Sequence, residues 1–170
     1  MAKRIILNTA FWHKQKVNKL KSKDATMVFA YLLSNPKITR TGIYTIFSEE
    51  IASGLGRNII DAEQTRAALE ELETTGLIKY EHEADVVYIV GFRQYSNFAS
   101  GKPSIVANEL LAEFEEYDKD NKRIANFWFE YVQENQEQLL VFEDRLNRSR
   151  ANTEKVTIKP LLDLILPNKK

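Results

Sequence analysis

The segment Asp61–Tyr80, DAEQTRAALEELETTGLIKY, contains one helix with both of its ends and the strand that follows. Asp61 and Gln64 have the spacing of a capping box, in which each side chain accepts the backbone N–H of the other residue. This pair predicts where the helix begins. Apolar and small residues then recur at helical spacing and predict its buried face. These inward-facing residues are Thr65, Ala68, Leu69 and Leu72.

The same segment predicts the end of this helix and the start of a β-hairpin. Gly76 can adopt the left-handed backbone conformation that closes a helix, and Leu77 can then pack onto Leu72, as in a Schellman motif. Residues 77–80 and 86–90 are rich in β-branched and aromatic side chains and flank a short polar connection. The pattern therefore predicts a two-stranded hairpin directly after the helix.

Upstream of this segment the sequence predicts two further helices and a strand. Residues 22–34 are expected to form a helix with Ser22 as its N-cap. Residues 41–46 are expected to form a short strand. A short second helix is expected to begin with Ser48 as its cap and to be stopped by Gly54 and Gly56. The helix beginning at Asp61 is therefore the third of this region.

The order of these elements is helix, strand, helix, turn, helix and hairpin, which predicts a winged helix-turn-helix. The two-helix unit alone buries too little apolar surface, and the hairpin covers its open side. The fold class is mainly α with a small β-hairpin wing, an α+β fold. We expect residues 1–100 to form this domain together with a basic amino-terminal segment. Residues 101–170 are expected to form a helical extension and an apolar carboxy-terminal tail.

Within the extension, two amphipathic stretches predict helices at residues 105–117 and 124–131. Residues 139–150 form either a third helix or a continuation of the second. The apolar tail must dock on its own domain or on a partner, because an exposed patch of that size is unusual for a monomer. The residues of the tail expected to hold subunits or a partner together are Leu161, Leu162, Leu164, Ile165 and Leu166.

The composition excludes several classes of protein. The chain has 170 residues, of which 44% are hydrophobic and 28% charged, and it has no cysteine. These values exclude a disordered or disulfide-stapled chain and any site built on thiolates. The sequence has no run of about 18 apolar residues and no apolar signal segment, so we expect a cytoplasmic protein without membrane contact.

The formal net charge of zero conceals a strong asymmetry along the chain. Residues 1–40 carry a net charge of +8, residues 41–100 a net charge of −6, and residues 101–170 a net charge of −2. Five lysines lie in one ten-residue stretch, residues 14–23, of the basic segment. Such a strip either faces phosphates or is a solvated loop. The five are Lys14, Lys16, Lys19, Lys21 and Lys23.

The sequence offers little catalytic chemistry. Its two histidines, His13 and His82, lie in a Lys-rich segment and a predicted hairpin connection, without metal-ligand spacing, and are interpreted as surface residues. No Walker A, G-x-S-x-G or G-x-G-x-x-G motif occurs. We therefore expect no catalytic residue, no metal site, no cofactor and no enzymatic activity. Adjacent carboxylates are interpreted as solvated helix surfaces at Glu49-Glu50, Glu70-Glu71 and Glu115-Glu116.

A helix-turn-helix usually places its second helix in the major groove of DNA. Here the outer face of that helix carries Glu63 and Glu70, and the hairpin carries Glu81, Glu83 and Asp85 near its tip. Because these carboxylates repel phosphates, we expect attraction for DNA to come from lysines and arginines outside them. The candidate DNA-binding residues are Lys14, Lys16, Lys19, Lys21, Lys37, Arg40, Arg57, Asn58, Gln64 and Arg66.

Several short motifs resemble the winged-helix domain of phage and prophage replication-initiation proteins, the replisome organisers. That group is similar to the amino-terminal part of the DnaD-type primosome proteins. The resemblance covers residues 5–117. It is carried by Phe11-Trp12, Ser34-Asn35-Pro36, Thr41-Gly42-Ile43-Tyr44, Gly76-Leu77-Ile78-Lys79-Tyr80 and Arg93-Gln94-Tyr95.

The resemblance implies a function and a set of partners. It implies a protein of a bacterial host cell, associated with the nucleoid, that binds origin or primosomal DNA, self-associates and recruits the replicative helicase or its loader. The Tyr-x-x-x-Ile-x-x-Trp motif of the DnaD carboxy-terminal domain is absent, so residues 101–170 could serve assembly instead.

Two alternatives stay open. One is a transcriptional regulator with the same fold. The other is a protein-interaction module that binds through its acidic helix and hairpin.

Overall fold

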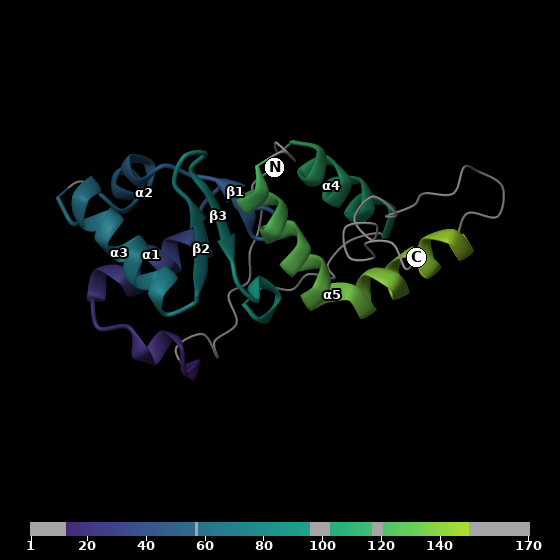
Figure 1. The fold of residues 1–170 in the computed structure, drawn as a ribbon, viewed down its shortest axis with the longest axis horizontal. Helices are drawn as coiled ribbons and strands as arrows, with labels where there is room; N and C mark the ends of the chain where they lie inside the picture. The colour runs from purple at the N-terminus through teal and green to yellow at the C-terminus, as the bar shows by residue number, and fades with distance from the viewer. Residues whose placement is uncertain (1–12, 57, 96–102, 117–120, 150–170) are drawn as a thin grey trace. The chain divides into compact units, whose positions relative to one another are not determined.

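The structure, a computed structural model, describes residues 13–56, 58–95, 103–116 and 121–149 (Figure 1). The chain divides into two compact units, residues 1–98 and residues 99–170. Three sets of residues that the sequence analysis singled out lie outside the described residues. They are Phe11-Trp12, Arg57 and the apolar tail with Leu161, Leu162, Leu164, Ile165 and Leu166.

The described residues of the first unit form three α-helices and a three-stranded antiparallel sheet. The strands lie in the order β1-β3-β2, so that β3 is the central strand and pairs with both of its neighbours. The 3₁₀ turns η2 (Val17–Lys19) and η3 (Phe92–Gln94) flank these elements. In chain order the elements are α1 (Lys23–Leu32), β1 (Ile43–Thr45), α2 (Ser48–Leu55), α3 (Ala62–Thr74), β2 (Ile78–Glu81) and β3 (Val86–Ile89).

The second unit contains α4 (Pro103–Glu116) and α5 (Lys122–Ser149). Asn121 caps α5, because its Oδ1 accepts the backbone N–H groups of Arg123 and Ile124 at 3.0 and 3.2 Å. The predicted third helix at residues 139–150 is a continuation of α5, which runs unbroken through the polar residues 133–138. The rings of Phe114 and Trp128 pack edge to face at 5.3 Å between the two helices. The described residues thus form an α+β fold, as predicted.

Both predicted ends of α3 are confirmed. Gln64 N–H donates to Asp61 Oδ1 at 2.8 Å, and Asp61 N–H donates to Gln64 Oε1 at 3.0 Å, which is the capping box. Gly76 has a φ of +66°, its N–H donates to Glu73 O at 2.9 Å, and Leu77 N–H donates to Leu72 O at 3.0 Å. These bonds are the Schellman motif, and they direct the chain from α3 into β2.

Two predictions about α2 are wrong. The N-cap is Phe47 rather than Ser48, because the Glu50 carboxylate reaches back to accept Phe47 N–H at 3.1 Å and so starts the helix one residue earlier. The helix also continues through Gly54 to Leu55, and it ends at Gly56, the second of the two predicted stops, whose φ is +105°. A Cβ at Gly54 would lie 2.1 Å from the Tyr31 hydroxyl oxygen, so the Tyr31 side chain of α1 would have to move to admit a larger residue here.

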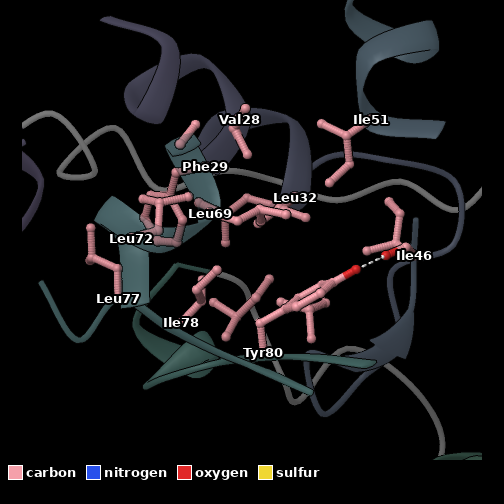
Figure 2. Close-up of a cluster of buried hydrophobic side chains, with 14 of the residues drawn as sticks. Val28, Phe29, Leu32, Ile46, Ile51, Leu69, Leu72, Leu77, Ile78 and Tyr80 are labelled. Atoms are coloured by element: carbon pink, nitrogen blue, oxygen red, sulfur yellow. Dashed lines mark hydrogen bonds between the residues drawn. The ribbon is translucent and has the colours of Figure 1, made fainter. Parts of the chain in front are cut away.

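The core of this unit lies between the helices and the sheet (Figure 2). Side chains of α1 and α3 meet there with those of β2, among them the ring of Tyr80. The Tyr80 hydroxyl lies 2.7 Å from Ile46 O and 2.8 Å from Asp85 Oδ1, both of them acceptors. Burial, and then the neighbouring Asp85 carboxylate, raise the pKa of Tyr80 above its ordinary value, so the phenol remains a donor. This contact ties the hairpin to the chain just before α2.

Gly42 and Gly76 allow a matched test of the turn that leads into β1. Both have positive φ, of +74° and +66°, but a Cβ at Gly42 would lie 2.8 Å from Phe92 Cβ, whereas one at Gly76 meets only the flexible Lys16 Nζ at 3.6 Å. We expect Gly76→Ala to lower the free energy of unfolding by about 1 kcal/mol and Gly42→Ala by about 2–4 kcal/mol. Chemical denaturation of the two variants measures the difference. Equal losses would contradict the packing of Phe92 against Gly42.

Candidate nucleic-acid interface

The lysine strip, defined as Lys14, Lys16, Lys19, Lys21 and Lys23, lies on a segment that is fixed to the domain. Val17 of η2 is buried in the core, and Leu20 packs against its edge. The Glu71 carboxylate on α3 accepts the backbone N–H groups of Lys21 and Ser22 at 2.6 and 3.3 Å. The backbone that carries the lysine strip is therefore fixed to the domain at Val17, Lys21 and Ser22.

Two lysines of the strip also contact the domain through their ammonium groups. Lys16 Nζ donates to Gly76 O at 3.0 Å, beyond the carboxyl end of α3, where a positive charge is favoured by the helix dipole. Lys14 Nζ lies 3.4 Å from Gln94 Oε1. Neither contact neutralises the charge. None of the ion pairs between described residues involves Lys19, Lys21 or Lys23, and all three are exposed.

The cations around α2 and α3 are placed differently, because each is paired with a carboxylate of the first turn of α2. Lys37 Nζ lies 2.6 and 2.7 Å from the two carboxylate oxygens of Glu50 and 5.8 Å from the centre of the Phe47 ring. Arg66, in the second turn of α3, donates through Nη2 to Glu49 Oε1. Both pairs are open to solvent. Two of the predicted DNA-binding cations, Lys37 and Arg66, therefore already have anionic partners.

The electrostatics of the first turn of α2 keep both carboxylates ionised. The hydrogen bond from Lys37, assisted by the Phe47 N–H, holds the pKa of Glu50 below its ordinary value. For Glu49 a backbone hydrogen bond lowers the pKa most, followed by the Ser48 hydroxyl and the charge of Arg66. At neutral pH these two charges offset those of Lys37 and Arg66.

The other predicted residues of this face are used in different ways. Gln64 supplies its amide oxygen to the capping box of α3. Asn58 is exposed in the turn between α2 and α3, and Arg40 is half-buried with interactions of its own. Arg66 lies ten residues before Gly76, which corresponds to about 15 Å along a helix. The strip and Arg66 thus occupy opposite ends of α3.

The hairpin tip is less acidic at its surface than the sequence suggested. Glu81 is buried, and the carboxylate of Asp85 turns inward to accept the Tyr80 hydroxyl. Glu83 is exposed. His82 is a surface residue, as predicted, and its Nε2 lies 3.2 Å from Glu73 Oε2. The carboxylate of Asp85 is therefore occupied by a bond that fixes the turn.

Sequence reasoning missed the partners of the adjacent carboxylates. Glu49-Glu50, Glu70-Glu71 and Glu115-Glu116 were expected to be solvated helix surface, and Glu49, Glu70, Glu115 and Glu116 are indeed exposed. However, Glu71 holds the lysine strip, and Glu49 and Glu50 hold Arg66 and Lys37. A signal was present in part: Glu50 stands three residues after Phe47, the spacing at which a carboxylate accepts the N-cap N–H.

Comparison of the chain with protein-family models, with curated proteins and with solved structures found no match. Among the residues that the structure describes, no helix is both long and apolar enough to cross a membrane. The same described ranges contain no group of three or more histidine, aspartate or glutamate side chains placed to hold a metal ion.

Glu71→Ala, compared with Glu70→Ala, tests how the lysine strip is held. Removing the Glu71 acceptor leaves two N–H groups without their carboxylate, so we expect amide hydrogen exchange at Lys21 and Ser22 to become about tenfold faster. Glu70→Ala removes an exposed neighbour and is expected to leave this exchange unchanged. Hydrogen exchange followed by NMR gives both results. Equal protection in the two variants would mean that Glu71 does not hold the strip.

Proposed function

We propose that this chain is a non-enzymatic DNA-binding protein of the winged helix-turn-helix type that acts in replication initiation as a phage-type replisome organiser. The observation that carries the proposal is the lysine strip. Its five ammonium groups belong to one ten-residue segment, residues 14–23, and Val17 and Glu71 fix this segment to the domain. A row of cations on a defined backbone is suited to neutralising consecutive phosphates.

The arrangement of the first unit supports the winged-helix assignment. Helices α2 and α3 follow one another across a short turn, and the β2–β3 hairpin follows α3, with β1 as a third strand beside β3. A hairpin in this place covers the open side of the two-helix unit. The order helix, strand, helix, helix, strand, strand is that of a winged helix.

The proposed mode of binding relies on charge more than on base reading. On the exposed side of α3, Glu63, Ala67 and Glu70 offer no donor to a base edge. The exposed donors in the first two turns of this helix are Gln64 and Arg66, and Arg66 is paired with Glu49. Lys19, Lys21 and Lys23 carry charges that no described carboxylate pairs. Contacts of this kind fix a protein on the duplex and carry little sequence information.

One observation favours a second function, a module that binds proteins. Lys37 and Arg66 are both neutralised by α2, so the α2–α3 face carries no net positive charge from them. Such a face is better suited to a protein than to a phosphate backbone. The two functions are compatible in one chain, since the strip lies at the other end of α3.

The proposed partners follow from the resemblance to replisome organisers. They are DNA, a replicative helicase or its loader, and further copies of this chain. Residues 99–170 form a unit of their own and are proposed to serve assembly. A transcriptional regulator remains the alternative that reads DNA with α3.

Replacement of Lys14, Lys16, Lys19 and Lys21 by alanine tests the proposed interface. The wild-type chain is expected to neutralise about four to six phosphates of a duplex, which gives a slope of log affinity against log salt of roughly −4 to −5. The fourfold variant should flatten this slope to roughly −1, whereas lysine to arginine at the same four positions should keep it. Fluorescence anisotropy over a salt series measures the slopes. An unchanged slope in the alanine variant would place the interface elsewhere.

Arg66→Ala separates the proposal from the regulator alternative. Because Glu49 already pairs with Arg66, we expect the substitution to change duplex affinity by less than about 0.5 kcal/mol. A helix that reads bases would instead lose about 1–3 kcal/mol when a base-contacting arginine is removed. Titration with several unrelated duplexes decides the matter, since only base reading makes the loss depend on sequence.

A further inference from the structure

The first turn of α2 presents two consecutive carboxylates, and each is bound to a different cation. Glu49 binds Arg66 of α3, and Glu50 binds Lys37 of the loop before β1. The two cations come from segments that lie on either side of α2 in the sequence. The pairs involve side chains that are 40–61% exposed. Both pairs therefore lie where a phosphate could approach the same two cations.

The start of a helix in this place is where a helix-turn-helix meets the DNA backbone. Free N–H groups and the positive end of the helix dipole favour a phosphate there, and nearby cations add to the attraction. In this chain carboxylates bind both nearby cations and one N–H group at the start of α2. Glu50 accepts Phe47 N–H at 3.1 Å as well as the Lys37 ammonium, and Glu49 accepts the Arg66 guanidinium. The carboxylates occupy the role that phosphate oxygens would have.

We propose that Glu49 and Glu50 act as internal competitors of DNA phosphates and so suppress duplex binding by the α2–α3 face. This inference rests on the proposed DNA-binding function and adds a regulation to it. DNA then binds at the lysine strip, because Lys37 and Arg66 on the α2–α3 face are already paired with carboxylates. Without these two carboxylates, Lys37 and Arg66 become available as phosphate ligands.

The double variant Glu49→Gln and Glu50→Gln tests the proposal. Glutamine keeps an oxygen that can accept Phe47 N–H, so the start of α2 is preserved while both charges are removed. Two further cations released to phosphates steepen the salt slope of duplex binding by about 1.8. Between about 50 and 200 mM salt the affinity should then fall about tenfold more than that of the wild type.

The matched control is Glu63→Gln with Glu70→Gln. It removes the same number of charges from α3, but from carboxylates that make no ion pair with another described residue. The control is expected to raise affinity slightly at low salt and to leave the slope unchanged. Adding Lys37→Ala and Arg66→Ala to the Glu49 and Glu50 variant should restore the wild-type slope. Circular dichroism melting of each variant confirms that it is folded.

The outcomes distinguish this inference from the function on which it rests. A wild-type chain that binds duplex with the expected slope, together with an unchanged slope in the Glu49 and Glu50 variant, overturns the inference and leaves the proposed function standing. Equal steepening in the variant and in the Glu63 and Glu70 control also overturns it, because general charge would then be the cause. Absence of duplex binding in both wild type and variant overturns the two together.

Discussion

The burial of the inner face of α3 against α1 and β2 is the constraint on which the rest of the first unit depends. Leu69 and Leu72 are buried in that contact, and the Schellman motif at Gly76 turns the chain so that Leu77 continues the same core. The hairpin follows at once, and the Tyr80 hydroxyl bonds to Ile46 O before α2. With α3 fixed, both of its ends are fixed as well. One end carries the lysine strip and the other carries Arg66.

Carboxylates act differently on two surfaces of this domain: they neutralise the cations of one and leave the cations of the other without an ion pair among the described residues. On α2, Glu49 and Glu50 receive side-chain cations, and the charges cancel locally. On α3, Glu71 receives backbone N–H groups, so it holds the strip without pairing any ammonium of it. The same residue type therefore neutralises one surface and organises the other. The difference lies in what each carboxylate accepts, a charged side chain or a neutral amide.

Sequence reasoning predicted the parts of the fold that are encoded locally. The caps at Ser22 and at Asp61 with Gln64, and the turn at Gly76, depend on residues within a few positions of one another, and the structure has them all. The pairing of β1 with β3 joins residues more than forty positions apart, and the strand pattern alone did not indicate it. Gly54 was interpreted as a helix stop. The contact that favours a small residue at this position is with the Tyr31 ring, which lies on another helix and is not visible in the local sequence pattern.

The charged site was less predictable than the fold for a related reason. A pair of adjacent glutamates has the same pattern in sequence whether it is solvated, pairs a cation or holds a loop. Glu71 and Glu49 acquire their roles from Lys21 and Arg66, which lie 50 and 17 residues away. Composition identified the lysine strip correctly as a cluster, but the contact of Lys16 with Gly76 O is a property of the folded chain.

The most direct test of the central claim is an NMR titration of the ¹⁵N-labelled full chain with a short duplex at low salt. We predict that the amide signals of residues 13–23, and those around Gly76 at the end of α3, shift progressively with added DNA, whereas the signals of α2 change little. Shifts confined to α2 and the first turns of α3, with residues 13–23 unaffected, would contradict the claim that the lysine strip is the DNA-binding surface.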